Sequence, residues 1–281
     1  MTLDRIAIVG SGRVGLTLAR ALTHSGSNVV TLGRERRQLP EPLAPTRTDW
    51  APVLDRSDLV LVAVPDDAIT AVAGALARTG VIARRHVVLH TSGLHDRSAL
   101  GPLEPTGAAL GSWHPLQTFV AEVGDPDALA GSAAVIEGDS RALEAGRGLA
   151  ARLHLGPVVE LPSAGKAGYH AAAVFASNYL VVLAEVARRL GAAAGAGDVA
   201  AEMFMPLMQR TLANYATGAA AALTGPIRRG DAGTVQQHLA ALTGAERMLY
   251  VALGREALQL ARDAGLEPEK AAAIQRLLTA E

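Results

Sequence analysis

The chain has 281 residues and a formal net charge of −1, with 49% hydrophobic and 19% charged residues. This length exceeds one typical domain, and the apolar content excludes a disordered chain. Acidic and basic residues are nearly balanced and scattered, so nothing indicates binding to nucleic acid or an anionic membrane, and we expect a small-molecule partner. The absence of cysteine excludes disulfides, thiolate metal sites and a cysteine nucleophile, and we expect no metal.

The N-terminus and the longest apolar stretch bear on localisation. Asp4 and Arg5 lead directly into the apolar residues 6–9, which leaves no room for a signal peptide, so we expect a cytoplasmic protein. The stretch 171–187 is interrupted by Glu185 and two other polar residues, and falls short of a clean membrane span. We expect it to form a buried helix, without a membrane partner.

The apolar pattern changes once along the chain. Up to about residue 161, short apolar runs alternate with helical patterns, which is typical of β–α units with a mostly parallel sheet. The expected strands are 5–9, 28–32, 58–64, 86–90, 108–113, 133–136 and 157–161. The expected later helices are 164–190, 198–222, 231–262 and 268–279. We therefore predict a doubly wound α/β domain over residues 1–162 and an all-α domain over residues 163–281.

A glycine-rich turn follows the first expected strand and leads into a helical run at 16–22. In a nucleotide-binding turn of the pattern G-x-G-x-x-G, the first glycine allows the tight turn and the second lets the backbone approach a pyrophosphate. The third permits close packing of helix on strand. A turn that binds nothing is the alternative, but the strand before it and the helix after it favour a dinucleotide. The residues predicted to bind it are Gly10, Ser11, Gly12, Arg13, Val14 and Gly15.

Basic residues follow the second expected strand. A site selective for NAD usually has an acidic side chain here, against the ribose 2′-hydroxyl, but this chain has Gly33 and Arg34. A guanidinium can bind the 2′-phosphate of NADP through paired hydrogen bonds and stack on adenine. We therefore predict NADP, with Arg36 or Arg37 assisting. The alternatives are a solvated basic turn and a ribose contact from Glu35.

Three more strands end at the same edge of the expected sheet. Val64 and Pro65 follow the third, where a cofactor-lining loop and a capped helix start have the same pattern. The next two strands end in His-Thr-Ser-Gly at 90–93 and in Gly-Ser-Trp-His-Pro-Leu at 111–116. We expect Val64, Pro65 and Thr91 to line the cofactor.

His114 is the histidine with the strongest functional position, at the end of its strand. It could orient or protonate a substrate carbonyl beside the nicotinamide, and a loop-packing role is the alternative. The histidines expected to be structural are His24, His86, His95, His154 and His238.

The first helix of the second expected domain carries a polar stripe. At about 100° per residue, Lys166, His170 and Ser177 fall on one face of an otherwise apolar helix, and we expect Ser177 to bind substrate. A lysine in the first turn of a helix is unfavourable next to the helix dipole, which favours a functional role for Lys166. The alternative is a lysine side chain that simply reaches solvent.

Further along, residues 223–231 form a polar turn rich in Gly and Pro. Thr224 and Arg228, or Arg229, could bind a substrate carboxylate, and a plain helix connection with Asp231 as N-cap is the alternative.

Together these motifs make the chain similar to the 6-phosphogluconate-dehydrogenase-like superfamily of Rossmann proteins, over nearly its whole length. The motifs that carry the resemblance are H-T-S-G at 90–93, H-P-L-Q-T-F at 114–119, K-x-x-x-H at 166–170 and L-T-G-P-x-x-R-G-D at 223–231. The resemblance implies an N-terminal Rossmann domain that binds NADP, an all-α C-terminal domain of the same superfamily, and oxidoreductase activity. It also implies a homodimer, because long Ala-rich helices in such second domains commonly pair.

Two groups of relatives imply roles in the site. Ketopantoate reductases and 3-hydroxy-acid dehydrogenases have a Lys and, four residues later, an Asn on this helix, which match Lys166 and, with His in place of Asn, His170. Ser92 and His114 resemble the Ser and His-Pro pair of prephenate and arogenate dehydrogenases, where the His engages the substrate hydroxyl. A composite catalytic site of these four residues is therefore implied.

The leading hypothesis is hydride transfer to or from a small carboxylate-bearing oxo acid, imine or hydroxy acid, with ketopantoate reduction the most concrete instance. A non-catalytic NADP-binding regulator or partner protein is the first alternative, because a fold alone does not prove catalysis. Hydride exchange between NADP and a deazaflavin, also suggested by resemblance, is the second.

Overall fold

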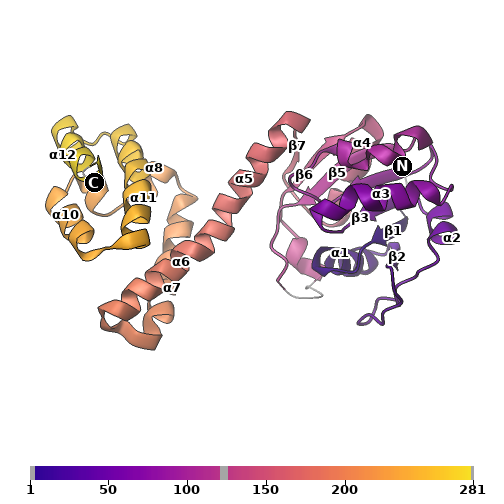
Figure 1. The fold of residues 1–281 in the computed structure, drawn as a ribbon, viewed down its shortest axis with the longest axis horizontal. Helices are drawn as coiled ribbons and strands as arrows, with labels where there is room; N and C mark the ends of the chain where they lie inside the picture. The colour runs from indigo at the N-terminus through magenta and orange to yellow at the C-terminus, as the bar shows by residue number, and fades with distance from the viewer. Residues whose placement is uncertain (1–3, 121–125, 280–281) are drawn as a thin grey trace. The chain divides into compact units, whose positions relative to one another are not determined.

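The computed structural model describes residues 4–120 and 126–279. Contacts divide the chain into unit 1, Met1–Asn178, and unit 2, Tyr179–Glu281 (Figure 1). Each unit has its own apolar core. The sheet ends at Glu160, close to the domain boundary expected after residue 162, while the first helix that follows it belongs to unit 1.

Unit 1 contains one sheet with the strand order β2-β1-β3-β4-β5-β6-β7. Its strands are β1 (Arg5–Val9), β2 (Asn28–Leu32), β3 (Leu59–Val62), β4 (Val87–His90), β5 (Ala109–Pro115), β6 (Ala134–Gly138) and β7 (Val158–Glu160). Only the β5–β6 pair is antiparallel among these strands. The α/β class and the seven expected strands are confirmed, and β5 extends to include His114.

The strands of unit 1 are apolar at successive positions, so both faces of the sheet are apolar. Helices cover both faces. Ile6 and Ile8 of β1 join one apolar cluster, and Ala7 and Val9 join another, as the alternation of a strand requires. The helices of the first cluster are α1 (Arg13–His24) and α4 (Ser140–Arg152). Those of the second are α2 (Trp50–Asp55), α3 (Ile69–Arg78) and the 3₁₀ helix η2 (Arg97–Thr106). The carboxyl edge of the sheet is then the place for a ligand.

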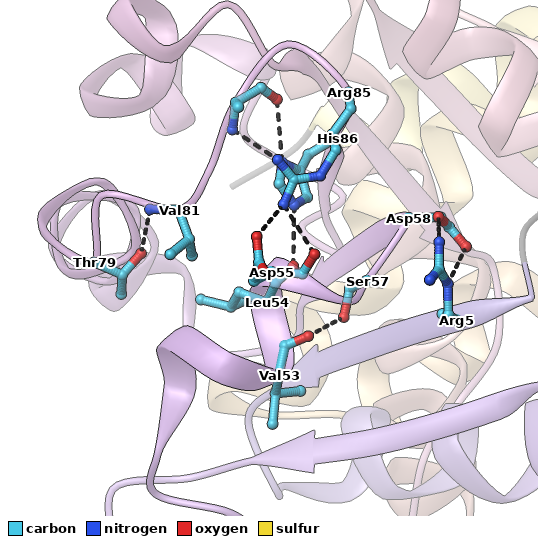
Figure 2. A network of polar contacts seen from close by, with 11 residues as sticks. Arg5, Val53, Leu54, Asp55, Ser57, Asp58, Thr79, Val81, Arg85 and His86 are labelled. Atoms are coloured by element: carbon cyan, nitrogen blue, oxygen red, sulfur yellow. Dashed lines mark hydrogen bonds and ion pairs between the residues drawn. The ribbon is translucent and has the colours of Figure 1, made fainter.

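A network of polar contacts joins the amino ends of the strands (Figure 2). His86 is fully buried before β4, and the Ala83 N–H donates to its Nδ1 at 2.9 Å. Its Nε2–H therefore donates to the carbonyl of Leu54 at 3.0 Å. Beside it, Arg5 pairs with both carboxylate oxygens of Asp58, at 2.7 and 3.1 Å. His86 is thus structural, as the sequence indicated.

After the sheet, α5 (Lys166–Ala176) completes unit 1, and helices make up unit 2. These helices are α6 (Asn178–Gly191), α7 (Ala200–Tyr215), α8 (Ala219–Ala222), α9 (Pro226–Arg229), α10 (Ala232–Ala241), α11 (Gly244–Asp263) and α12 (Pro268–Thr279). The core of unit 2 includes Val235, Leu258 and Ile274. The expected helix over 231–262 is two helices, because the backbone is extended at Leu242 and takes a φ of +52° at Gly244.

The expectation that residues 171–187 are buried is wrong. Within this stretch, Val181 of α6 is 68% exposed and Val182 is 49% exposed. Leu207 and Leu212 of α7, farther along the chain, are exposed as well. The helical stretch Ser163–Tyr215 also satisfies the length and composition of a membrane span, which the sequence reading denied. The apolar composition of these helices indicates that their surface packs against another apolar surface, but it does not identify that surface.

His86→Leu should lower the free energy of unfolding of unit 1 by about 2 to 4 kcal/mol, because it leaves the Ala83 N–H and the Leu54 carbonyl without partners. Both tryptophans, Trp50 and Trp113, lie in unit 1, so urea denaturation followed by tryptophan fluorescence measures this change. The control is His24→Leu at an exposed position, expected to change stability by less than about 0.5 kcal/mol. Equal effects of the two variants would contradict a structural role for His86.

Candidate active site

The turn between β1 and α1 is closed on one side and open on the other. Gly10 has a φ of +117°, and a Cβ there would lie 2.2 Å from the carbonyl oxygen of Ala63. A Cβ at Gly15 would lie 2.2 Å from the carbonyl oxygen of Gly10. At Gly12 a Cβ would meet nothing within 4 Å, so the backbone there borders open space. The three glycines therefore have the tight-turn, open and close-packed surroundings that a pyrophosphate-binding turn requires.

Helix α1 begins beside this opening. Arg13 and Val14 occupy its first turn, which has no acidic residue. The first N–H groups of a helix have no partner within it, and the helix dipole favours an anion at this end. The open backbone at Gly12 and these N–H groups fit a dinucleotide pyrophosphate.

The basic loop after β2 is held by a buried threonine. Thr46 donates its hydroxyl hydrogen to the Glu35 carbonyl at 2.7 Å and accepts from the Arg37 N–H at 2.7 Å. The indole N–H of Trp50 donates to the Gly33 carbonyl at 3.1 Å. Arg34, between these anchors, is exposed. The loop thus has a fixed backbone and a guanidinium directed to solvent at the carboxyl end of β2.

The other predicted cofactor-lining residues lie at the same edge. Val64 contacts the turn closely, since a Cβ at Gly10 would lie 3.1 Å from its Cγ1. Pro65 follows it and is exposed, and the Thr91 N–H donates to the Val62 carbonyl at 3.1 Å. The structure therefore places these residues along the ends of β1, β3 and β4.

A buried lysine lies at the ends of β4 and β5. Lys166, from the first turn of α5, is only 1% exposed. Its ammonium donates to the Ser92 carbonyl at 3.1 Å and to the Ser112 hydroxyl at 2.9 Å. Burial lowers the pKa of Lys166, and the carboxylate of Glu137 opposes this shift. Two of the three ammonium hydrogens are thus bound by protein oxygens.

His114 lies close to this lysine and is partly accessible. Its Nδ1 lies 2.7 Å from the Tyr169 hydroxyl, and the two rings meet edge to face at 5.7 Å. Burial, followed by the charge of Lys166, lowers the pKa of His114 to about 4. Burial also raises the pKa of Tyr169 to about 12. Both side chains are therefore neutral near pH 7.

Gly93 brings two histidines together. A Cβ at this position would lie 3.0 Å from His114 Nε2 and 3.0 Å from His170 Cδ2. A side chain at this position would therefore press on both imidazoles at the end of β4. Over the part of the chain that the structure describes, no group of three or more His, Asp or Glu side chains could hold a metal ion.

Ser92 and His90 shape the loop that binds Lys166. The Ser92 hydroxyl accepts from the N–H groups of Leu94 and His95, both at 3.1 Å, so it stabilises a turn while its carbonyl binds the lysine. The Ser92 N–H donates to Nδ1 of His90 at 3.2 Å, and Nε2 of His90 donates to the Asp96 carbonyl at 2.9 Å. Burial lowers the pKa of His90 to about 4, so this imidazole is neutral and structural.

The structure brings together four of the sequence-derived candidates, Ser92, His114, Lys166 and His170. Ser177 is not among them. It ends α5 with φ −125° and ψ −70°, eleven residues after Lys166, or about 16 Å along a helix. Ser177 is therefore too far from Lys166 along the helix to belong to the same site, although helical periodicity put both on one face.

Sequence reasoning missed Ser112, Tyr169 and Glu137 as members of this site. Ser112 lies two residues before His114 on β5, so strand alternation places both on one face. Tyr169 lies one residue before His170, where its hydroxyl reaches the strand end. Glu137 accepts from the Ser163 hydroxyl at 3.0 Å and so ties β6 to the start of α5.

The two candidates of unit 2 line a pocket of their own. Thr224 and Arg228 border a space of about 670 Å³ together with Arg229 and Lys270. The guanidinium of Arg228 donates to the Ala264 carbonyl at 3.1 Å. Asp231, just beyond, accepts from the Thr234 N–H at 3.0 Å and so caps α10, as the alternative for this turn indicated.

Known structures share this fold at low sequence identity. A candidate NADP oxidoreductase from Bacteroides fragilis is 22% identical, with a TM-score of 0.67, and the match covers 92% of this chain and 96% of that one. A protein from Thermotoga maritima is 22% identical, with a TM-score of 0.66 and coverages of 92% and 98%. Pyrroline carboxylate reductase from Plasmodium falciparum, solved with NADP bound, is 11% identical, with a TM-score of 0.58 and coverages of 98% and 97%.

Among curated proteins, none matches this sequence. Two family models match it. Residues 2–115 match the Rossmann-like domain, and residues 132–257 match the domain of unknown function DUF2520, which begins just before β6. The chain therefore contains a Rossmann-like domain followed by a DUF2520 domain.

Proposed function

We propose that this protein is an NADP-dependent oxidoreductase that transfers a hydride to or from a small carboxylate-bearing oxo acid, imine or hydroxy acid. Reduction of an oxo acid of the ketopantoate type is the most concrete instance. The observation that carries the proposal is the buried ammonium of Lys166 beside His114, at the same sheet edge as the glycine turn. Several structures with this fold are oxidoreductases by name, including the pyrroline carboxylate reductase with NADP.

The cofactor is assigned to the glycine turn and the basic loop. The backbone of Gly12 and the first turn of α1 bind the pyrophosphate, and Arg34 binds the 2′-phosphate. Val64, Pro65 and Thr91 line the remaining edge. When bound, the nicotinamide supplies the hydride in reduction and accepts it in oxidation.

The proton chemistry is assigned to Lys166. Reduction of a carbonyl builds negative charge on its oxygen, and a cation or proton donor placed there stabilises that charge. Two ammonium hydrogens of Lys166 are bound by Ser92 and Ser112, so the third donates to the substrate oxygen. Because burial lowers the pKa of Lys166, its pKa lies closer to neutral pH than that of a free lysine. This suits proton donation in one direction of the reaction and proton uptake in the other.

His114 and His170 are assigned to orienting the substrate, since both imidazoles pack around Gly93 at the end of β4 and both are partly accessible. Thr224 and Arg228 remain predicted carboxylate-binding residues on the chemistry of their own pocket, where Arg228, Arg229 and Lys270 outnumber the single carboxylate of Glu267. A cytoplasmic location remains an expectation.

One observation favours the alternative of a non-catalytic NADP-binding protein. Lys166 is almost inaccessible, and its two hydrogen bonds equally suit a lysine that only ties α5 to the sheet. Turnover distinguishes the two functions, since a binding protein retains NADPH affinity without oxidising the cofactor.

Arg34→Ala should weaken NADPH binding by about 10- to 150-fold, because each lost charge-assisted hydrogen bond contributes about 1.5 to 3 kcal/mol. NADH binding should change little, since NADH lacks the 2′-phosphate. Calorimetric titration of both cofactors measures the difference, with Arg56→Ala, exposed beyond α2, as the control. Equal losses for both cofactors would contradict the assignment of Arg34.

Lys166→Met keeps the buried stem and removes the ammonium. The kcat for NADPH oxidation by a small 2-oxo acid should fall by about 10² to 10⁴-fold, while the NADPH affinity changes little. Because only the ammonium donates a proton, wild-type reduction should also decline as pH rises through the lowered Lys166 pKa. Near-normal turnover in the variant would remove Lys166 from the chemistry and leave His114 and Ser92 as the candidates.

We further propose that the exposed apolar side chains of α6 and α7, including Val181 and Leu207, pair with those of a second copy. The sequence between Lys166 and Glu185 has no acidic or basic side chain other than His170, so nothing there indicates a charged partner. Analytical ultracentrifugation of the wild-type protein should give twice the mass of one chain. The double variant Val181→Asp, Leu207→Asp should give the mass of a single chain. A monomeric wild-type protein would overturn the homodimer.

A further inference from the structure

Which partner donates in the hydrogen bond between His114 and Tyr169 determines whether the other imidazole nitrogen is a donor or an acceptor for a ligand. This hydrogen bond joins the end of β5 to the first turn of α5, at 2.7 Å between Nδ1 and the hydroxyl oxygen. A neutral imidazole carries one N–H, on either nitrogen, and a phenol carries one O–H. Either the phenol donates to Nδ1, or Nδ1–H donates to the phenol oxygen.

The chemistry of the two groups favours the first arrangement. An unprotonated imidazole nitrogen is a stronger hydrogen-bond acceptor than a phenol oxygen, and a phenol O–H is a strong donor. Both groups stay neutral in the fold, because burial disfavours their charged forms. The tyrosine hydroxyl therefore donates to Nδ1, and the imidazole hydrogen lies on Nε2.

That hydrogen lies on the side of His114 that packs closely against Gly93. A Cβ at Gly93 would lie 3.0 Å from Nε2, and the same position would crowd His170. Among the described residues no buried side-chain nitrogen or oxygen lacks a hydrogen-bond partner, so Nε2, which makes no hydrogen bond in the structure, is accessible. A ligand that reaches this nitrogen meets an N–H donor from His114. The nearest positive charge, Lys166, is a donor as well, and its carbonyl and hydroxyl partners are already engaged.

Within the residues that the structure describes, no acidic side chain hydrogen-bonds to these donors, although the charge of Asp66 acts on both Lys166 and His114. Glu137 accepts from the Arg97 N–H at 2.7 Å and from the Ser163 hydroxyl at 3.0 Å, so both of its oxygens are occupied. Asp96 accepts from Ser98. A protonated imine, which is a cation and an N–H donor, would meet two donors and a like charge, whereas a carbonyl oxygen would accept from both.

We infer that Tyr169 is a positioning residue that holds His114 as an Nε2–H donor, and that the site thereby selects a carbonyl substrate over an imine. This inference rests on the proposed hydride transfer for its substrate part. The state of His114 in the protein alone does not depend on any activity, so it can be tested even if no substrate turns over.

The first test is the tautomer of His114 by ¹⁵N NMR of the ligand-free chain, with the signal assigned from its absence in His114→Gln. We expect an unprotonated Nδ1 and a protonated Nε2, and a mixture of tautomers in Tyr169→Phe. The matched control is Tyr250→Phe, which removes the equivalent hydroxyl contact to His238 Nδ1, 2.9 Å long, in unit 2. A protonated Nδ1 in the wild-type protein, or no change in Tyr169→Phe, would overturn the role of Tyr169.

The second test compares NADPH oxidation by small 2-oxo acids and by cyclic imines. The wild-type kcat/KM should be higher for the oxo acids than for the imines. Tyr169→Phe should lower the kcat/KM for oxo acids by about 10-fold, the effect of one hydrogen bond of roughly 1.4 kcal/mol. The kcat/KM for imines should not change. Tyr250→Phe should change neither. Preference for imines would overturn the carbonyl selection. No turnover of either class would sink the proposed function, while the tautomer would still decide the role of Tyr169.

Discussion

A lysine ammonium buried at the end of a parallel sheet constrains everything around it. Such a charge is tolerated inside a protein only when its donors are bound. Here the Ser92 carbonyl and the Ser112 hydroxyl bind Lys166, so β4, β5 and the first turn of α5 must keep one arrangement. Tyr169 and His170 share that turn, and their approach to His114 and Gly93 follows from it. The choice of lysine also matters, because its pKa shifts on burial while that of arginine does not in practice.

The two halves of the carboxyl edge are built on different principles. Around β1 and β3 the site is made by missing side chains: Gly10 and Gly15 allow close backbone contact, and Gly12 leaves space. Around β4 and β5 it is made by buried polar groups. Desolvation of Lys166 and of two neutral histidines opposes folding, whereas the network at the amino edge, with His86 at its centre, satisfies its polar groups (Figure 2).

The sequence predicted the sheet well because parallel strands buried on both faces are short continuous apolar runs, bounded here by Gly, Pro and polar residues. It predicted the glycine turn because each glycine there has a separate steric reason. Ser112 and Tyr169 were missed because a lone serine in a strand or a tyrosine in a helix has no distinctive pattern. The break at Ser177 and the exposure of α6 were missed because apolar periodicity carries neither a local φ and ψ nor the identity of a packing partner.

The polar half of the edge also explains why the neutral state of His114 matters. If this imidazole were protonated, two cations would share one small space, in which Glu137 is bound by Arg97 and Ser163 and the charge of Asp66 is the weakest influence on the His114 pKa. Burial and Lys166 both act against that state. In the proposed reaction, one charge, on the lysine, lies where the reacting oxygen becomes negative, and the histidine contributes direction without charge. A site with one cation and neutral donors stabilises a developing oxyanion more than it stabilises an uncharged ground state, which is what catalysis of carbonyl reduction requires.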